Sequence, residues 1–164
     1  MWIVAKYKKN KILQLKSKTK ILFKNSILYS PKILINYFKN NKLINKEVNL
    51  LNDYIFIFSH DFKKKDKLNN LNFTKGIKFV LNNSSYTQKE LEDFISKCKN
   101  FENSKGYLKQ EFFNFVKNDK YKFSSGPFTN LVFSIIKETQ KQIELLIGNK
   151  TYRVKKDKYL YFPI

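Results

Sequence analysis

The residue types that carry most enzymatic chemistry are scarce in this sequence and do not form a catalytic group. His60 is the only histidine and Cys98 is the only cysteine. Asp61 follows His60, but a neighbouring histidine and aspartate are too common to indicate catalysis, and no candidate nucleophile or second metal ligand accompanies them. We expect His60 to be structural or solvent-exposed, and Cys98 to be a small core residue on the apolar stripe of a helix. Since the sequence also has no glycine-rich phosphate loop and no metal-ligand spacing, we expect no active site, cofactor or metal ion.

Positive charge is the strongest feature of the composition. The 164 residues include 33 basic and 13 acidic side chains, which gives a formal net charge of +20, and residues 1–46 hold twelve lysines and no acid. Such a surface attracts a polyanion without reading its sequence, because Coulomb attraction to phosphate needs no special geometry. The alternative is a solvated helix face that an AT-rich coding sequence has enriched in lysine. The candidate nucleic-acid contacts in this segment are Lys8, Lys9, Lys11, Lys16, Lys18 and Lys20.

Several classes of protein are disfavoured. A single cysteine excludes a disulfide framework and suits a reducing compartment. The first ten residues have a short apolar run before the lysines, which is the reverse of a secretory signal. The longest apolar runs are strand-sized and far shorter than the roughly 20 residues that cross a bilayer. We therefore expect a cytoplasmic, monomeric protein that does not bind membranes.

Hydrophobic patterning predicts two domains of different architecture. In the first, strands alternate with helices, which favours a mixed or antiparallel sheet with helices packed against it. Asn40 and Asn41 separate two β-prone runs and predict a tight hairpin turn, and residues 87–90 form a capping box for a helix. The expected strands of this domain lie at 2–7, 26–34, 33–38, 43–48, 50–58 and 77–81, and the expected helices lie at 12–22, 63–70 and 88–98.

After a polar stretch at 100–106 the pattern changes to short β segments. A short helix or strand is expected at 107–115, followed by strands at 120–124, 131–137, 142–147, 151–155 and 158–162. Five short strands separated by turn signals predict a small barrel. We therefore expect an α+β protein with domains at 1–100 and 113–164, joined by a linker at 101–112.

The order of several motifs resembles that of NusG-type transcription elongation factors. A tryptophan-led strand is followed by a helix, by Tyr29-Ser30-Pro31 and by LLNDYIFI at 50–57, where the family has roughly LFPGYIFV. GIKFV at 76–80 resembles the next strand of the family, and SGPFTNL at 125–131 resembles the segment that opens its C-terminal KOW barrel. Asn52 and Asp53 replace a proline and a glycine, and Asn130 and Phe133 replace two KOW glycines. These departures resemble a specialised, RfaH-like paralogue.

This resemblance implies a NusG N-terminal-like (NGN) domain, a KOW (SH3-like) barrel and a non-enzymatic role in transcription elongation or antitermination. In the family the first domain docks on the clamp helices of RNA polymerase and suppresses pausing, while the KOW barrel is an adaptor for a small-subunit ribosomal protein or Rho. The resemblance assigns polymerase docking to Trp2, Leu51, Tyr54 and Phe56. It assigns the KOW partner-binding loop to Gly126, Pro127, Phe128 and Asn130.

Each of these assignments has an alternative. Aromatic side chains in strands are commonly core, and Phe128 is equally suited to pack on its own barrel. Asn130 can adopt a left-handed turn conformation, but Phe133 cannot imitate a glycine and must pack somewhere.

The alternative function is a basic, KOW-containing RNA-binding ribosomal or ribosome-assembly protein. We favour the elongation factor, because a ribosomal protein would not need Trp2, Tyr29-x-Pro31 and residues 50–57 in this order. An enzyme acting on nucleic acid has no catalytic constellation to support it.

Overall fold

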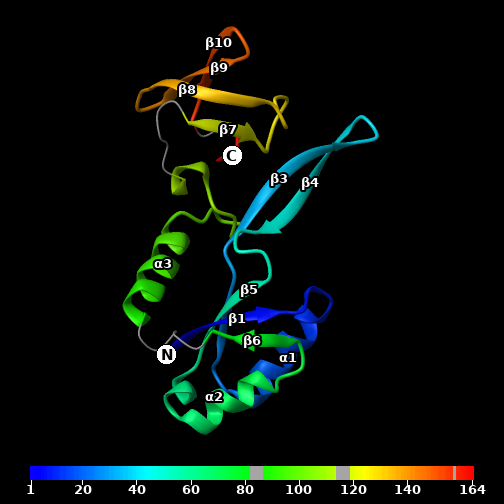
Figure 1. Ribbon diagram of the computed structural model, residues 1–164, viewed down its shortest axis with the longest axis vertical. Helices are drawn as coiled ribbons and strands as arrows, with labels where there is room; N and C mark the ends of the chain where they lie inside the picture. Colours follow the sequence, from blue (N-terminus) through cyan, green and yellow to red (C-terminus); the bar gives the residue numbers. More distant parts are fainter. Residues whose placement is uncertain (82–86, 114–118, 157) are drawn as a thin grey trace. The chain divides into compact units, whose positions relative to one another are not determined.

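The protein is α+β, and its internal contacts divide it into two compact units. The computed structural model describes residues 1–81, 87–113, 119–156 and 158–164, without the side chains of residues 37 and 38 (Figure 1). The first unit comprises Met1–Pro31 and Asn49–Lys97, and the second comprises Lys32–Val48 and Cys98–Ile164. The domain ranges expected from the sequence, 1–100 and 113–164 with a linker at 101–112, stay a prediction.

A four-stranded antiparallel sheet forms the centre of the first unit. Its strands, in spatial order, are β2 (Ile27–Tyr29), β5 (Tyr54–Phe58), β1 (Trp2–Tyr7) and β6 (Ile77–Val80). The strand expected at 2–7 is confirmed. The strand expected at 50–58 begins only at Tyr54, because residues 50–53 form a turn in which Asn52 has a positive φ of 51°.

Helices cover both faces of this sheet, since side chains alternate between the faces along each strand. The helices are α1 (Ile12–Leu22), α2 (Lys65–Asn72) and α3 (Gln88–Asn100), with short 3₁₀ turns η1 (Lys9–Lys11) and η2 (His60–Lys63). On one face Leu15 of α1 and Leu71 of α2 pack in a core with Ile57, and on the other face Ile95 of α3 packs with Trp2.

A β-hairpin belongs to the second unit. Strands β3 (Lys32–Lys39) and β4 (Lys42–Asn49) pair through a turn in which Asn40 and Asn41 both have positive φ, 50° and 59°. Asparagine tolerates this left-handed backbone, and two such residues in succession are what a two-residue hairpin turn requires. The predicted hairpin is confirmed.

The second unit also contains a five-stranded antiparallel sheet, in the order β10 (Lys150–Lys155), β9 (Gln142–Ile147), β8 (Val132–Glu138), β7 (Lys120–Phe123) and β11 (Tyr161–Pro163). Its core is aromatic: Phe133 is buried and its ring lies 4.3 Å from that of Phe123 and 5.8 Å from that of Tyr121. The expectation that Phe133 packs inside and that Asn130 takes a left-handed conformation (φ 73°) is confirmed.

The residues that follow α3 are held within the second unit. The buried side-chain amide of Gln110, in the short turn η4 (Gln110–Phe112), accepts a hydrogen bond from the Tyr161 backbone N–H at 2.8 Å. The same amide donates to the Tyr161 carbonyl at 3.1 Å. Gln110 therefore pairs with β11 as a neighbouring strand would. The element expected at 107–115 is this 3₁₀ turn, and its positions 114 and 115 lie outside the described residues.

Candidate functional site

One face of the first unit's sheet is rich in aromatic side chains. Cross-strand register places Trp2 opposite Phe58, Val4 opposite Phe56, and Lys6 opposite Tyr54. These residues share a face with positions on the two outer strands, since register also pairs Tyr29 with Phe56 and Phe79 with Lys6. We call this set the aromatic sheet face; its members are Trp2, Val4, Lys6, Tyr29, Tyr54, Phe56, Phe58 and Phe79.

Helix α3 covers one end of the aromatic sheet face. Its residues Leu91, Phe94 and Ile95 belong to one apolar cluster with Trp2 and Phe56, and the Phe94 ring lies 5.7 Å from that of Phe56. Trp2 is only 8% exposed and Phe56 only 4% exposed. Both residues therefore lie in the packed interior beneath α3, and only side chains elsewhere on the face reach solvent.

A glutamine fixes the start of α3 to the sheet. The side chain of Gln88 accepts a hydrogen bond from the Trp2 backbone N–H at 2.8 Å and donates one to the Trp2 carbonyl at 2.6 Å. The neighbouring N-terminal ammonium group of Met1 donates to the Ser59 carbonyl at 2.9 Å. Burial, with a contribution from Lys63, lowers the pKa of this ammonium group. The first residues of β1 are thus held by hydrogen bonds as well as by apolar packing.

The other end of the aromatic sheet face is accessible. Tyr54 is half-buried and Phe79 is 43% exposed, and their rings meet edge-on with centroids 6.5 Å apart. The Lys6 ammonium group lies 5.3 Å from the centroid of Tyr54 and 5.9 Å from that of Phe79. Leu81 is 41% exposed just beyond β6, whereas Leu51, before β5, is half-buried against the cluster of Trp2, Phe56 and Ile95. This accessible end combines apolar side chains with a cation over two ring faces.

The lysines near the N-terminus lie on the surface of the first unit. Lys16, Lys18 and Lys20 are exposed on α1, but at 100° per residue Lys16 and Lys20 lie on one flank of the helix and Lys18 on the other. Lys8 and Lys9 are exposed, and Lys11 is partly buried. Lys9 forms an ion pair with Asp53 at 3.4 Å. The structure therefore makes these lysines accessible without gathering all six on one helix face.

The loop expected to bind a KOW partner is a well-defined turn between β7 and β8. The Thr129 hydroxyl donates to the Gly126 carbonyl at 2.6 Å, and the Asn130 backbone N–H donates to the Phe123 carbonyl at 2.9 Å. Pro127 and Asn130 are exposed, whereas Phe128 is half-buried against the aromatic core of the sheet. Phe128 thus packs on its own unit while one side of its ring lines a pocket.

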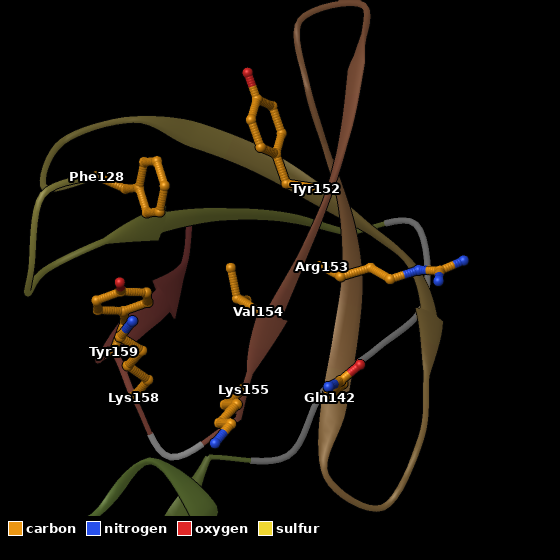
Figure 2. A pocket seen from close by; sticks show the side chains of 8 residues that line it. All are labelled: Phe128, Gln142, Tyr152, Arg153, Val154, Lys155, Lys158 and Tyr159. Atoms are coloured by element: carbon orange, nitrogen blue, oxygen red, sulfur yellow. The ribbon is translucent and has the colours of Figure 1, made fainter.

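That pocket is a cavity of about 680 Å³ on the second unit (Figure 2). Val154 lies at its centre, among the rings of Phe128, Tyr152 and Tyr159 (Figure 2). The Phe128 ring lies 5.7 Å from that of Tyr159 and 6.3 Å from that of Tyr152. The remaining lining residues are Gln142, Arg153, Lys155 and Lys158.

Sequence reasoning missed most of this pocket and part of the sheet face. The signal for the pocket is the alternation in β10, which places Tyr152 and Val154 on the same face, close to two lysines. Tyr159 has no such signal in the sequence. It lies before β11, outside the strands, so no alternation pattern predicts that its side chain lines the pocket. Sequence reasoning missed Phe79 because only the register of β1 with β5 and β6 brings it near Tyr54.

The sole histidine and the sole cysteine of the sequence have different surroundings. His60 is exposed, with its ring edge-on to Phe58 at 5.0 Å, and Cys98 is buried. Within residues 1–81, 87–113, 119–156 and 158–164, no group of three or more histidine, cysteine, aspartate or glutamate side chains is positioned to hold a metal ion. Among those same residues, no helix is both long and apolar enough to span a bilayer.

Comparison with known proteins leaves the family open. No family model matches the chain, and no curated protein matches it. Among solved structures, a chain in the crystal structure of an MjSpt4:Spt5 complex is 12% identical, with a TM-score of 0.32 over 100% of this chain and 98% of that chain. A structure of Thermotoga maritima NusG is 13% identical, with a TM-score of 0.32 over 94% of this chain and 91% of that chain.

Proposed function

We propose that this protein is a non-enzymatic transcription elongation or antitermination factor of NusG type, which docks on the RNA polymerase clamp helices through its first unit. The observation that carries the proposal is the accessible end of the aromatic sheet face, where Tyr54, Phe79 and Lys6 lie together. The motif order in the sequence points to the same part of the molecule, since Tyr54 begins the strand that resembles the family's docking segment.

The chemistry of this surface suits a partner helix. Large apolar side chains in a shallow, partly buried setting are typical anchors for a helix that presents its own apolar stripe. Lys6 adds a cation that can pair with an acidic side chain on the partner, because its ammonium group lies over exposed ring faces. Of the four residues assigned to docking, Tyr54 and Leu51 are the ones we propose to touch the partner. Trp2 and Phe56 support them from beneath α3.

The remaining parts of the proposal concern charge and the second unit. We propose that the N-terminal lysines contact the nucleic acid of the elongation complex in a sequence-tolerant way. We also propose that the five-stranded sheet is a KOW-type barrel acting as an adaptor for a ribosomal protein or Rho, and that the protein acts in the cytoplasm as an RfaH-like paralogue. The alternative, an RNA-binding ribosomal or ribosome-assembly protein, is favoured only by the aromatic and basic pocket of the second unit.

The test is the affinity of purified full-length protein for core RNA polymerase. Truncating an interface aromatic typically costs about 2 kcal/mol or more, so Tyr54→Ala is expected to weaken binding by roughly thirtyfold and to abolish any anti-pausing activity. Tyr54→Phe keeps the ring and is expected to bind within about twofold of wild type. Phe73→Ala is the matched control, because Phe73 is an aromatic of the same unit, 88% exposed and outside the aromatic sheet face.

Thermal unfolding separates docking from a structural role for Tyr54. Lost binding with a nearly unchanged melting temperature supports docking, whereas a large fall in melting temperature assigns Tyr54 to the core. Full polymerase affinity in a well-folded Tyr54→Ala protein would remove the proposed docking surface.

A further inference from the structure

The second unit carries a pocket whose chemistry the proposed function does not use. Its cavity of about 680 Å³ is lined by the rings of Phe128, Tyr152 and Tyr159 and by Lys155 and Lys158 (Figure 2). We propose that this pocket binds an unpaired base of a single-stranded nucleic acid, while the two lysines hold the flanking phosphates. The inference goes beyond the proposed function and concerns the other unit of the protein.

The three rings meet at steep angles, and one of them, Tyr152, is exposed. Phe128 and Tyr159 meet edge to face at 87°, and Phe128 and Tyr152 are tilted by 56°, so the rings do not stack on one another. Tyr159 packs directly on Gly126, where a Cβ atom would lie 2.4 Å from the tyrosine ring. Tyr152 remains 37% exposed. A planar base can therefore lie against a tyrosine face in this pocket, and base–aromatic stacking tolerates any base because each has a π-face.

The charge around the rings suits phosphate. Lys155 and Lys158 are exposed, and none of the eight described lining residues is acidic. The Lys158 ammonium group lies 5.3 Å from the centroid of Tyr159, within reach of the phosphate of a nucleotide whose base occupies the pocket. Arg153 contributes less, because its guanidinium group pairs with Glu144 at 3.5 Å and points away from the rings (Figure 2).

A nucleotide is the occupant that uses all of these groups. An acidic peptide would engage the lysines and leave the ring faces unused, and an apolar peptide would use the rings and bury lysines without a counter-charge. A cavity of this size lies within the range of about 300–1,000 Å³ that accommodates small ligands. A base pair inside a duplex is excluded, since both of its faces are already stacked on neighbouring pairs. The pocket should therefore select unpaired strands over duplexes.

The first experiment measures affinity by fluorescence anisotropy, with the full-length protein and labelled ten-nucleotide probes. The probes are oligo-U RNA, oligo-dT DNA, a duplex, and an abasic strand that carries the same number of phosphates. We expect the strands with bases to bind about tenfold more tightly than the abasic strand, which measures charge attraction alone. Comparison of the affinities for oligo-U and oligo-dT shows whether the pocket binds RNA or DNA more tightly. Equal affinity for the abasic strand would overturn the proposal.

The second experiment removes one chemical feature at a time. Tyr152→Leu keeps apolar volume but loses the π-face. This variant is therefore expected to bind oligo-U only as tightly as the wild-type protein binds the abasic strand. Tyr152→Phe keeps the ring and is expected to bind oligo-U as tightly as wild type. Lys155→Gln with Lys158→Gln is expected to flatten the slope of log K against log salt by about 1.4, since each neutralised phosphate in a single strand contributes about 0.7.

A matched control and a direct map complete the test. Lys120→Gln with Lys122→Gln makes the same charge change on β7, outside the pocket, and is expected to leave the slope unchanged. Photocrosslinking of the wild-type protein with 5-iodouridine RNA is expected to label Phe128, Tyr152 or Tyr159. Labelling confined to the first unit, or competition by hexaglutamate as strong as that by oligo-U, would overturn the proposal. A failure here leaves polymerase docking through Tyr54 intact, and a failure of docking leaves this pocket intact.

Discussion

The hydrogen bonds between Gln88 and Trp2 offer the sharpest test of how the first unit is built. Gln88 satisfies both the backbone N–H and the backbone carbonyl of Trp2, at 2.8 and 2.6 Å, and so fixes the start of α3 over the aromatic sheet face. Gln88→Leu removes both bonds but keeps a side chain of similar size. We expect this change to loosen the start of α3 from β1 and to expose the tryptophan.

The size of the effect follows from the removal of two hydrogen bonds. Each bond contributes about 0.5–1.5 kcal/mol, and an unpaired buried backbone group costs about 1–3 kcal/mol. Because the freed groups lie at the end of β1 and can recover water once α3 moves, we expect the free energy of unfolding to fall by about 1–3 kcal/mol in total. Gln88→Glu keeps the acceptor but sets a carboxylate oxygen against the Trp2 carbonyl, so it is expected to lose at least as much.

The assay uses the single tryptophan of the chain as its reporter. Trp2 is 8% exposed, so its emission is expected to be blue-shifted and poorly quenched by acrylamide in the wild-type protein. In Gln88→Leu the emission is expected to shift to the red and the quenching constant to rise, while urea unfolding gives the change in free energy. Gln14→Leu, at an exposed position on α1, is the matched control and should change neither quantity. Unchanged quenching and stability in Gln88→Leu would refute the claim that Gln88 holds α3 on the sheet.

Three further outcomes are expected. Burial raises the pKa of Tyr161, so the folded state retains the phenol proton while the unfolded chain ionises near pH 10. The free energy of unfolding should therefore fall above about pH 10, by up to about 1.4 kcal/mol per pH unit, and Tyr161→Phe should remove that component in urea titrations. Replacing Lys8, Lys9 and Lys11 with glutamine should flatten the salt dependence of duplex binding, by about 0.9 for each phosphate that these lysines neutralise; an unchanged slope would remove this segment from the interface. Limited trypsin digestion should cut first within residues 100–106, and a protein that resists cleavage there would contradict the predicted boundary.

Local patterns predicted most of the secondary structure because the physics that decides it is local. The run 2–7, apolar except for Lys6, is a strand. The asparagine pair at 40–41 forms a turn, because asparagine tolerates the left-handed backbone that this turn requires. Helical spacing located α1, although Leu22 is 51% exposed and Phe23 is buried in its place. The helix ends at Leu22, so the periodicity no longer decides which side chain faces the core.

The functional surfaces were only partly predictable, because they depend on contacts between distant segments. Tyr54 was identifiable from its strand, but its neighbours Lys6 and Phe79 come from β1 and β6, and only strand register brings them together. Burial of Trp2 beneath α3 could not be inferred either, since a Trp-led strand has the same pattern whether a helix or a partner covers it. Glutamine side chains that pair with a strand, as Gln88 does, leave no signature in hydrophobic periodicity.

Experiments can distinguish the two proposed binding surfaces, because a different interaction dominates the affinity at each. At the accessible end of the aromatic sheet face, one cation lies between two rings, so affinity there should depend mainly on apolar burial and only weakly on salt. In the pocket of the second unit, Lys155 and Lys158 adjoin the rings without an acidic side chain among the described lining residues. Binding there should therefore combine a salt-dependent attraction to phosphate with salt-independent stacking. A salt titration of polymerase binding and of nucleic-acid binding, each with wild type and with the ring variants, measures how strongly each affinity depends on salt. The two surfaces can therefore be distinguished even though both belong to one strongly basic chain.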